Sequence, residues 1–398
     1  MRLTDSLDVP SSLIGPVDFL ENVVEGGVGS LTESLTNAQL TGVVESPLYE
    51  PLANGVVLYA TAMVSAFVVK LVLKIALLPV LSVAGSNTFL SADTYELGRK
   101  LGGGSYGAVF EGQRASDSEA SVVIKTPGKD PRANEFALAE LQINQKLTLC
   151  GQAGRMASFQ GHYIDGGVTL VHKLEGSTTL DQALQSKTFP MNVEELLTGK
   201  VSEIDRGDAD ATLAKRTMLT RKLTSQLFDN LAGIHGWDVV HRDIKGANLI
   251  LSESARRIKI IDFGAACDLF SRTNLDSTLQ VFDPSYCPPE APPSEGGLVA
   301  SAGGRFDVFS AGLVLVQMCF PQYRSAKGIA SFKKSLDLQD WQLKKWREAV
   351  EGNPGYAEGF EILDAAGGFG LLEACLRRDP NRRISSAAAA RHGFCRVF

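Results

Sequence analysis

The stretch His241-Arg242-Asp243-Ile244-Lys245-Gly246-Ala247-Asn248, followed by Asp262-Phe263-Gly264, decides how the whole chain is interpreted. Carboxylate and amide oxygens are the ligands that Mg²⁺ prefers, so we expect Asn248 and Asp262 to hold this ion. Asp243 is expected to accept the proton of a substrate hydroxyl group. Two short strand-like segments, the apolar residues 249–251 and the alternating residues 257–261, stand on either side of a turn and predict a hairpin that carries the metal ligands.

A glycine-rich run, Leu101-Gly102-Gly103-Gly104-Ser105-Tyr106-Gly107-Ala108-Val109, lies between two strand-like segments, residues 95–100 and 108–113. The same glycine pattern opens a helix in dinucleotide-binding folds, but no helical pattern follows it here. The next segment, Val122-Val123-Ile124-Lys125, is instead a further strand that ends in a lysine. Backbone amides without side chains can approach phosphates closely, so this order of strands predicts the roof of an ATP cleft.

Two acids on one predicted helix are candidates for an ion pair with Lys125. Residues 135–146 carry apolar side chains at helical spacing and include Glu135 and Glu140. We favour Glu140 because it lies in the middle of the helix, and a solvated surface glutamate is the alternative.

Residues 172–176 are predicted to form a hinge that connects the strands to the rest of the chain. The chain after this hinge is interpreted as mostly helical. His172 lies where the pocket ends, and we expect it to form part of the wall. A helical lobe begins at residue 177, a polar loop follows over residues 186–211, and a long amphipathic helix covers residues 213–235.

These motifs follow one another in the order typical of the eukaryotic protein kinases, and residues 93–398 resemble that family. The resemblance implies an α+β, bilobal protein-kinase fold, with a small β-rich N-lobe over residues 93–173 and a helical C-lobe over residues 177–398. Lys245, two residues after Asp243, is typical of serine/threonine kinases, and ATP and Mg²⁺ are the implied cofactors.

The resemblance also implies roles near the activation segment, which begins after Gly264 and ends at Glu290. Glu290 ends the run Asp283-Pro284-Ser285-Tyr286-Cys287-Pro288-Pro289-Glu290 and is expected to pair with Arg383. Arg242 is typical of kinases whose activation segment is ordered by phosphate. The implied site residues are Asp243, Lys245, Asn248, Lys125 and Glu140 for catalysis; Leu101, Gly102, Gly103, Gly104, Ser105, Tyr106, Gly107, Ala108, Val109 and Lys125 for ATP; Asn248 and Asp262 for the metal; and Arg242, Phe263, Gly264, Glu290, Asp307 and Arg383 for structure.

The region before the kinase-like part has a different composition. Residues 1–50 form an acidic segment that we expect to be mostly irregular, and residues 1–54 contain eight acids and one base. Residues 51–85 predict one transmembrane helix, because residues 51–69 carry no charge and approach the length that a bilayer requires. A buried soluble helix and an amphipathic helix at a membrane surface are the alternatives. Basic residues follow the span, so the kinase-like part would face the side of synthesis or its topological equivalent.

Charge and cysteine content exclude several classes of protein. The net charge of −6 gives no basic footprint for nucleic acid. The six cysteines include no C-x-x-C pair, and we expect them to be reduced thiols. Cys267 and Cys287 flank the activation segment and could respond to redox conditions, or could simply be small buried residues.

A closer resemblance rests on three segments: Lys187-Thr188-Phe189-Pro190-Met191-Asn192-Val193-Glu194, Asp283-Pro284-Ser285-Tyr286 and Phe306-Asp307-Val308-Phe309-Ser310-Ala311-Gly312-Leu313. They are similar to the chloroplast thylakoid kinases of state transitions and photosystem II phosphorylation. This implies a single-pass protein of the thylakoid membrane, in contact with lipid, whose kinase domain faces the stroma and acts on antenna or photosystem II proteins. The redox-sensing cysteine pair of that family has no counterpart in residues 1–54, and no transit peptide is visible.

Other functional classes remain open at this point. A pseudokinase or membrane scaffold would use the fold for binding alone, but such proteins usually lose a catalytic residue and none is lost here. A kinase of another membrane would have different substrates. A receptor kinase would sense its ligand through residues 1–54, which are too short and acidic to bury a core.

Overall fold

The computed structural model describes most of the chain that follows the predicted membrane span. Within these residues no helix combines the length and the apolar character needed to cross a membrane. The predictions for the acidic segment at residues 1–50, the span at residues 51–85, and Ser105 and Tyr106 fall outside the described residues. The described residues are 90–104, 107–115, 117–201, 208–275, 283–291 and 303–396.

The first lobe is built on a five-stranded antiparallel sheet with the strand order β1-β2-β3-β5-β4. Val122 and Ile124 of β3 and Val171 of β5 are buried in its core. β1 and β2 are paired as far as Gly104 and Gly107, so the glycine-rich run covers the end of β1 and the start of β2. The strands are β1 (Tyr95–Gly104), β2 (Gly107–Arg114), β3 (Asp117–Pro127), β4 (Phe159–Ile164) and β5 (Val168–Lys173).

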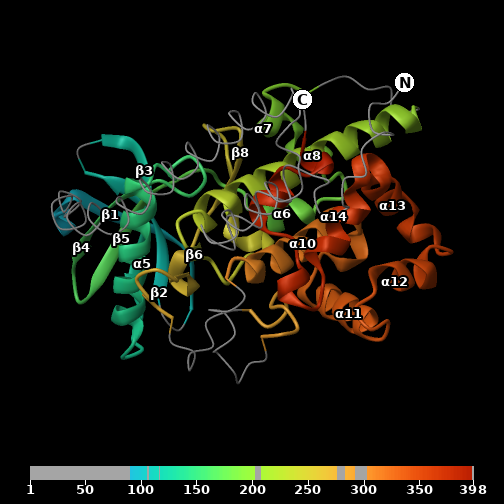
Figure 1. The fold of residues 1–398 in the computed structure, drawn as a ribbon. Helices are drawn as coiled ribbons and strands as arrows, with labels where there is room; N and C mark the ends of the chain where they lie inside the picture. The colour runs from blue at the N-terminus through green and yellow to red at the C-terminus, as the bar shows by residue number, and fades with distance from the viewer. Residues whose placement is uncertain are drawn as a thin grey trace, which may run out of the picture. The chain divides into compact units, whose positions relative to one another are not determined.

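One long helix, α5 (Ala133–Leu149), packs against this sheet (Figure 1). Phe136, Ile143 and Leu147 recur at helical spacing and are buried, which explains both the helix and the face that it turns inward. α5 is the helix that the sequence predicted over residues 135–146, and it extends a little further at both ends.

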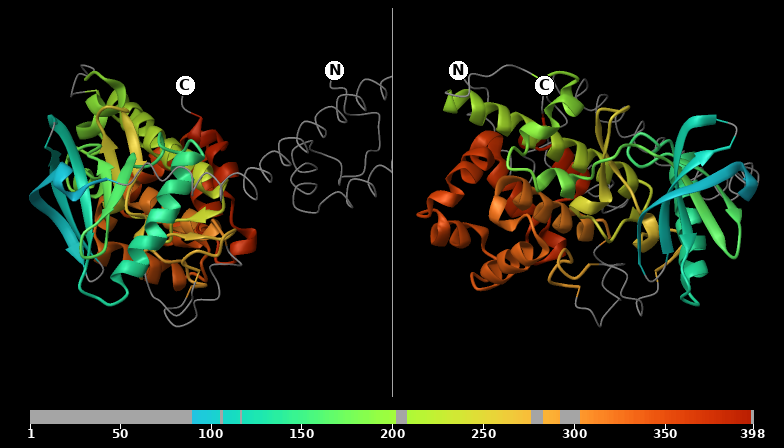
Figure 2. Two further views of the ribbon diagram at one scale, coloured as in Figure 1. Left: turned by 90° about the vertical axis from the view of Figure 1, so that its left-hand side faces the viewer. Right: turned by 180° about the vertical axis from the view of Figure 1, so that it is seen from behind.

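The second lobe is helical, and the hinge connects it to the sheet (Figures 1 and 2). α8 begins at an Asp208 cap and is the predicted amphipathic helix, and α10 is buried along almost its whole length. The helices are α6 (Leu180–Leu184), α7 (Glu194–Thr198), α8 (Ala209–His235), α10 (Arg305–Cys319), α11 (Ala326–Asp337), α12 (Leu343–Val350), α13 (Ala357–Asp364), α14 (Gly368–Cys375) and α15 (Ser386–Ala390).

Two small two-stranded sheets hold the site on the second lobe. β7 (Leu249–Ser252) and β8 (Arg257–Ile260) pair antiparallel, which confirms the predicted strand hairpin. β6 (Val239–Val240), which leads into the His241 loop, pairs with β9 (Cys267–Asp268), which follows the Asp262 segment. The two motifs are therefore fastened to each other by backbone hydrogen bonds.

The prediction of a polar loop over residues 186–211 was wrong in part. The segment contains a 3-10 turn, Met191–Val193, and then the short helix α7. Val193 and Leu197 are buried against the helical core, and Glu194 is buried in an ion pair with Lys215. The charges in this segment obscured a short apolar face in the sequence. This face is buried because the segment packs against α8.

Candidate active site

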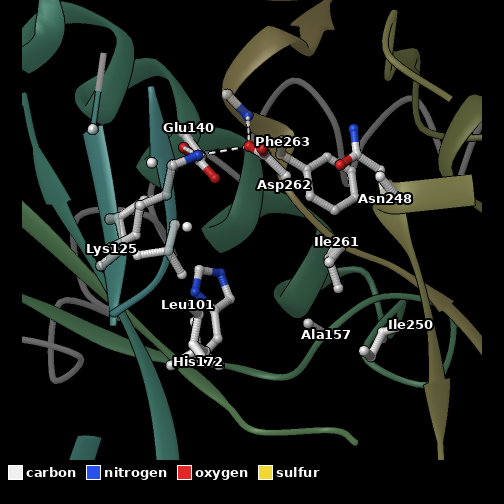
Figure 3. Close-up of a pocket in the computed structure, with 18 of the residues that line it drawn as sticks. Leu101, Lys125, Glu140, Ala157, His172, Asn248, Ile250, Ile261, Asp262 and Phe263 are labelled. Atoms are coloured by element: carbon white, nitrogen blue, oxygen red, sulfur yellow. Dashed lines mark hydrogen bonds and ion pairs between the residues drawn. The ribbon is translucent and has the colours of Figure 1, made fainter. Parts of the chain in front are cut away.

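A cleft of about 830 Å³ lies between the sheet and the helical lobe, bounded on one side by the glycine strands and on the other by the β7–β8 hairpin. Figure 3 shows Leu101 and His172 on the wall of the cleft and the charged groups at its inner end. The predicted site residues that line the cleft are Leu101, Gly102, Gly103, Gly107, Val109, Lys125, Glu140, Asp243, Asn248, Asp262, Phe263 and Gly264.

Lys125 lies at the centre of a three-charge cluster (Figure 3). Its Nζ is 2.7 Å from Glu140 Oε2 and 2.6 Å from Asp262 Oδ1. Glu140 is buried, whereas Glu135, the other candidate on α5, is exposed to solvent. Burial by itself would lower the pKa of Lys125, but the two carboxylates raise it above its ordinary value, so the ammonium stays charged. The attraction of Lys125 in turn lowers the pKa of Asp262.

The backbone of the Asp262-Phe263-Gly264 segment is shaped to present the carboxylate to the cleft. Asp262 adopts a left-handed conformation with φ of 63°, and its Oδ1 accepts a 3.2 Å hydrogen bond from the Gly264 amide. A Cβ on Gly264 would lie 3.1 Å from Lys125 Nζ and 3.2 Å from Asp262 Oδ1. A side chain at this position would therefore displace Lys125 and Asp262 by a few tenths of an ångström and disturb the charge cluster.

Asp243 is held by a set of polar contacts from the loop around it. Its Oδ2 accepts hydrogen bonds from Asn248 Nδ2 at 2.8 Å and contacts Lys245 Nζ at 3.0 Å. Its Oδ1 has one long contact, 3.3 Å, from the amide of Asp283. Burial raises the pKa of Asp243, while Lys245 opposes that rise. Oδ1 is thus the oxygen that can receive a hydrogen bond from a substrate hydroxyl.

The residues predicted to hold Mg²⁺ fit that role in their hydrogen bonding. The Nδ2 group of Asn248 donates to both the backbone oxygen and the carboxylate of Asp243, at 2.8 Å each, and this orients the amide. Among the described residues no hydrogen bond is donated to Oδ1 of Asn248, so this oxygen is available as a ligand. Asp262 engages Lys125 and Gly264 through Oδ1, and its side chain is 48% exposed, so Oδ2 is accessible from the cleft. One amide and one carboxylate, completed by phosphates and water, suit Mg²⁺.

A buried carboxylate below the site fixes the loop that carries Asp243. Asp307 of α10 is fully buried and accepts hydrogen bonds from the amides of His241 at 2.7 Å and Arg242 at 2.8 Å. Arg242 in turn donates from its guanidinium to the backbone oxygens of Ala265 at 2.5 Å and Asn274 at 2.9 Å. In this structure Arg242 therefore supports the activation segment through carbonyl groups.

The predicted pair of Glu290 and Arg383 forms a bidentate ion pair. Arg383 is fully buried, and its two terminal nitrogens lie 2.7 and 2.8 Å from the two oxygens of Glu290. Remaining guanidinium donors meet backbone oxygens, including that of Arg305 at 2.9 Å. This pair joins the end of the activation segment to the C-terminal part of the chain.

Two polar contacts near the hinge were missed by the sequence interpretation. Glu175 is buried and receives Lys259 Nζ at 2.8 Å and Ser252 Oγ at 2.9 Å, so the hinge is tied to the β7–β8 hairpin. His172 contacts Asn144 Oδ1 of α5 at 3.3 Å, and burial lowers the pKa of His172 to about 4. The one available signal in the sequence was Lys259, a charge placed between Ile258 and Ile260 of a short strand.

The cysteines fit the simpler of the two alternatives. All six are free thiols, and Cys267 and Cys287 are both buried in one small apolar cluster. Burial raises the pKa of Cys267 to about 11. A protonated, inaccessible thiol is a poor nucleophile, so these residues are packing groups in this conformation.

Comparison with known proteins gives a consistent result. The protein kinase domain model matches residues 95–395. The chain is 33% identical to the chloroplastic serine/threonine-protein kinase STN7 of Arabidopsis thaliana over 76% of its own length, and it spans 57% of that protein. It is 30% identical to the chloroplastic serine/threonine-protein kinase STN8 of the same plant, over 74% of this chain and 68% of that protein. A crystal structure of a Stt7 homolog from Micromonas algae, soaked with ATP, superimposes with a TM-score of 0.64 and 26% identity, covering 78% of this chain and 94% of that one.

Proposed function

This chain belongs to the protein kinase family as a serine/threonine kinase, and we propose that it is an active, membrane-anchored enzyme that phosphorylates thylakoid proteins. The kinase domain comprises residues 93–398, with its N-lobe at residues 93–173 and its C-lobe from residue 177. The observation that carries the activity is the charge cluster of Lys125, Glu140 and Asp262, formed at 2.6 to 2.7 Å beside an intact Asp243–Asn248 pair.

The chain's own residues divide the work of γ-phosphate transfer between them. Glu140 orients Lys125, which binds the phosphates of ATP under the glycine strands. Asn248 and Asp262 would hold Mg²⁺, which would supply positive charge to offset that of the phosphate oxygens. Asp243 accepts the hydrogen bond of the incoming Ser or Thr hydroxyl on Oδ1, aligns that oxygen and takes its proton. Lys245, 3.0 Å from Asp243, adds positive charge beside the reacting groups.

Replacing the proposed base tests whether the protein is an enzyme or a binding scaffold. We expect Asp243→Asn to lower kcat by roughly 10³-fold or more while ATP binding persists, because positioning and proton acceptance are lost. γ-³²P transfer to a generic Ser/Thr protein substrate is the assay, and Asp165→Asn, an exposed aspartate on the β4–β5 turn, is the matched control. Equal transfer by Asp243→Asn would refute the assignment, and no transfer by the native protein would favour the scaffold.

The proposed location and substrates rest on two supports. The similarity to STN7 and STN8, both chloroplast kinases by name, supports the chloroplast. The uncharged run in residues 51–69 supports a single membrane span, with residues 93–398 on the stromal side. Tethering raises the effective concentration of the cleft toward substrates in the same membrane. We therefore propose stroma-exposed Ser and Thr residues of antenna or photosystem II core proteins as substrates.

Protease protection tests this topology. Protease added to intact thylakoids is expected to remove the kinase domain and to spare an epitope placed in residues 1–54. If the kinase domain is protected from the protease, it lies in the lumen. That result would reverse the proposed topology and exclude the proposed substrates. If the full chain fractionates with a different membrane, the kinase assignment stands and the proposed thylakoid substrates are excluded.

A further inference from the structure

Glu140 can serve Lys125 only if α5 is held at the right place relative to the segment that carries Asp262. Within the small lobe, α5 is tied to the sheet by Asn134, which accepts a 2.8 Å hydrogen bond from the Val168 amide, and by the contact of Asn144 with His172. These contacts let α5 move with the sheet. They do not fix it against the lower side of the cleft.

On the lower side α5 packs against the Phe263–Ala265 turn, and its charged tie to that side is a buried ion pair. Lys146, in the last turns of α5, places its Nζ 2.7 Å from Asp268 Oδ2, and the two side chains are only 12% and 6% exposed. Asp268 belongs to β9, six residues after Asp262, and β9 is paired with β6 directly before the catalytic loop. The pair therefore connects the helix of Glu140 with the two segments that carry Asp243 and Asp262.

Asp268 is an anchor that stays in place without the lysine. Its Oδ1 accepts hydrogen bonds from the amides of Phe270 at 3.0 Å and Ser271 at 3.4 Å, and its Oδ2 accepts one from Ser271 Oγ at 2.8 Å. The same turn meets α5 a second time, where Thr273 Oγ1 donates to Gln142 Oε1 at 3.2 Å, but that contact is exposed to solvent. The charged and buried contact is the stronger of the two.

We propose that Lys146 and Asp268 are positioning residues, whose ion pair docks α5 on the activation segment and so keeps Glu140 within hydrogen-bond distance of Lys125. The proposal deepens the phosphotransfer function proposed above and rests on it. Neither residue touches ATP or the substrate hydroxyl. Without the pair, α5 is expected to swing with the sheet, and Lys125 is then left with Asp262 as its carboxylate partner.

Lys146→Met is the informative change, because it removes the tie and leaves the turn around Asp268 intact. We expect kcat to fall at least tenfold while KM for the protein substrate is unchanged, since the substrate surface is untouched. Lys146→Arg, which keeps the cation, is expected to restore most of the activity. The matched control is Lys215→Met, which breaks an ion pair of similar burial with Glu194 in the helical lobe. We expect that control to lose stability and to keep kcat within about twofold.

Hydrogen exchange provides a readout that does not depend on catalysis. Amides of α5 should exchange faster in Lys146→Met than in the native protein, and should not in Lys215→Met. If the native protein transfers no phosphate, the proposed function fails, and the exchange result still decides whether the pair docks α5. Unchanged exchange in α5, or a loss of kcat shared equally by Lys215→Met, would overturn the proposal. A Lys146→Arg variant as inactive as Lys146→Met would also overturn it.

Discussion

Replacing Glu140 with glutamine measures directly what the charge cluster contributes. Glu140 Oε2 lies 2.7 Å from Lys125 Nζ, the glutamate is 3% exposed, and glutamine keeps its size while removing its charge. Asp262, 2.6 Å from the same nitrogen, then becomes the remaining carboxylate partner of Lys125 and draws it toward a proposed metal ligand.

The expected size of the effect follows from the kind of bond that is lost. A hydrogen bond to a charged group contributes about 1.5–3 kcal/mol, and about 1.36 kcal/mol corresponds to a factor of ten in rate. Glu140→Gln should therefore reduce kcat/KM for ATP by roughly 10- to 150-fold. The fold should be nearly unaffected, because a buried neutral amide is easier to desolvate than a carboxylate.

The assay is steady-state γ-phosphate transfer at varied ATP, together with thermal unfolding of each variant. Glu135→Gln is the matched control, since it makes the same change on the same helix at an exposed position. It should retain activity within about twofold, as surface substitutions generally do. Retention of native kcat/KM by Glu140→Gln, or an equal loss in Glu135→Gln, would refute the reasoning.

Three further predictions follow from other contacts. Gly264→Ala places a methyl group 3.1 Å from Lys125 Nζ, so kcat/KM for ATP should fall roughly 10- to 100-fold with little change in melting temperature, and native kinetics would contradict the close approach. Arg383→Met leaves Glu290 without its bidentate partner and should lower the free energy of unfolding in urea by about 3–5 kcal/mol, whereas a loss below about 1 kcal/mol would show that the pair is not needed for the fold. Because burial lowers the pKa of His172 to about 4, the unfolded imidazole binds a proton below about pH 6.5 while the folded one stays neutral, so stability is lost as the pH falls from 6.5 to 4. His172→Gln should make unfolding midpoints less sensitive to pH over that range, and an identical pH dependence would exclude His172 as the cause.

The local elements of the site could be predicted from sequence because each depends on neighbours in the chain. The strand hairpin after Asn248 and the helix that contains Glu140 are determined by short runs of apolar residues with period two or 3.6. The one clear local error, the loop over residues 186–211, arose where a helix of five residues depends on packing against α8. Periodicity is too weak a signal over so short a segment.

The sequence alone determined which residue types carry the chemistry, because their order and spacing in the two motifs leave few other interpretations. Only the tertiary structure decided which acid serves Lys125, since Glu135 and Glu140 differ by the face of α5 on which they lie. It also showed Glu175 with Lys259, and Lys146 with Asp268, which are pairs distant in sequence. From the sequence alone, charged residues of this kind are predicted to lie on the solvent-exposed surface. They become buried partners only when the fold removes water from around them, and that is a property of packing that no local pattern records.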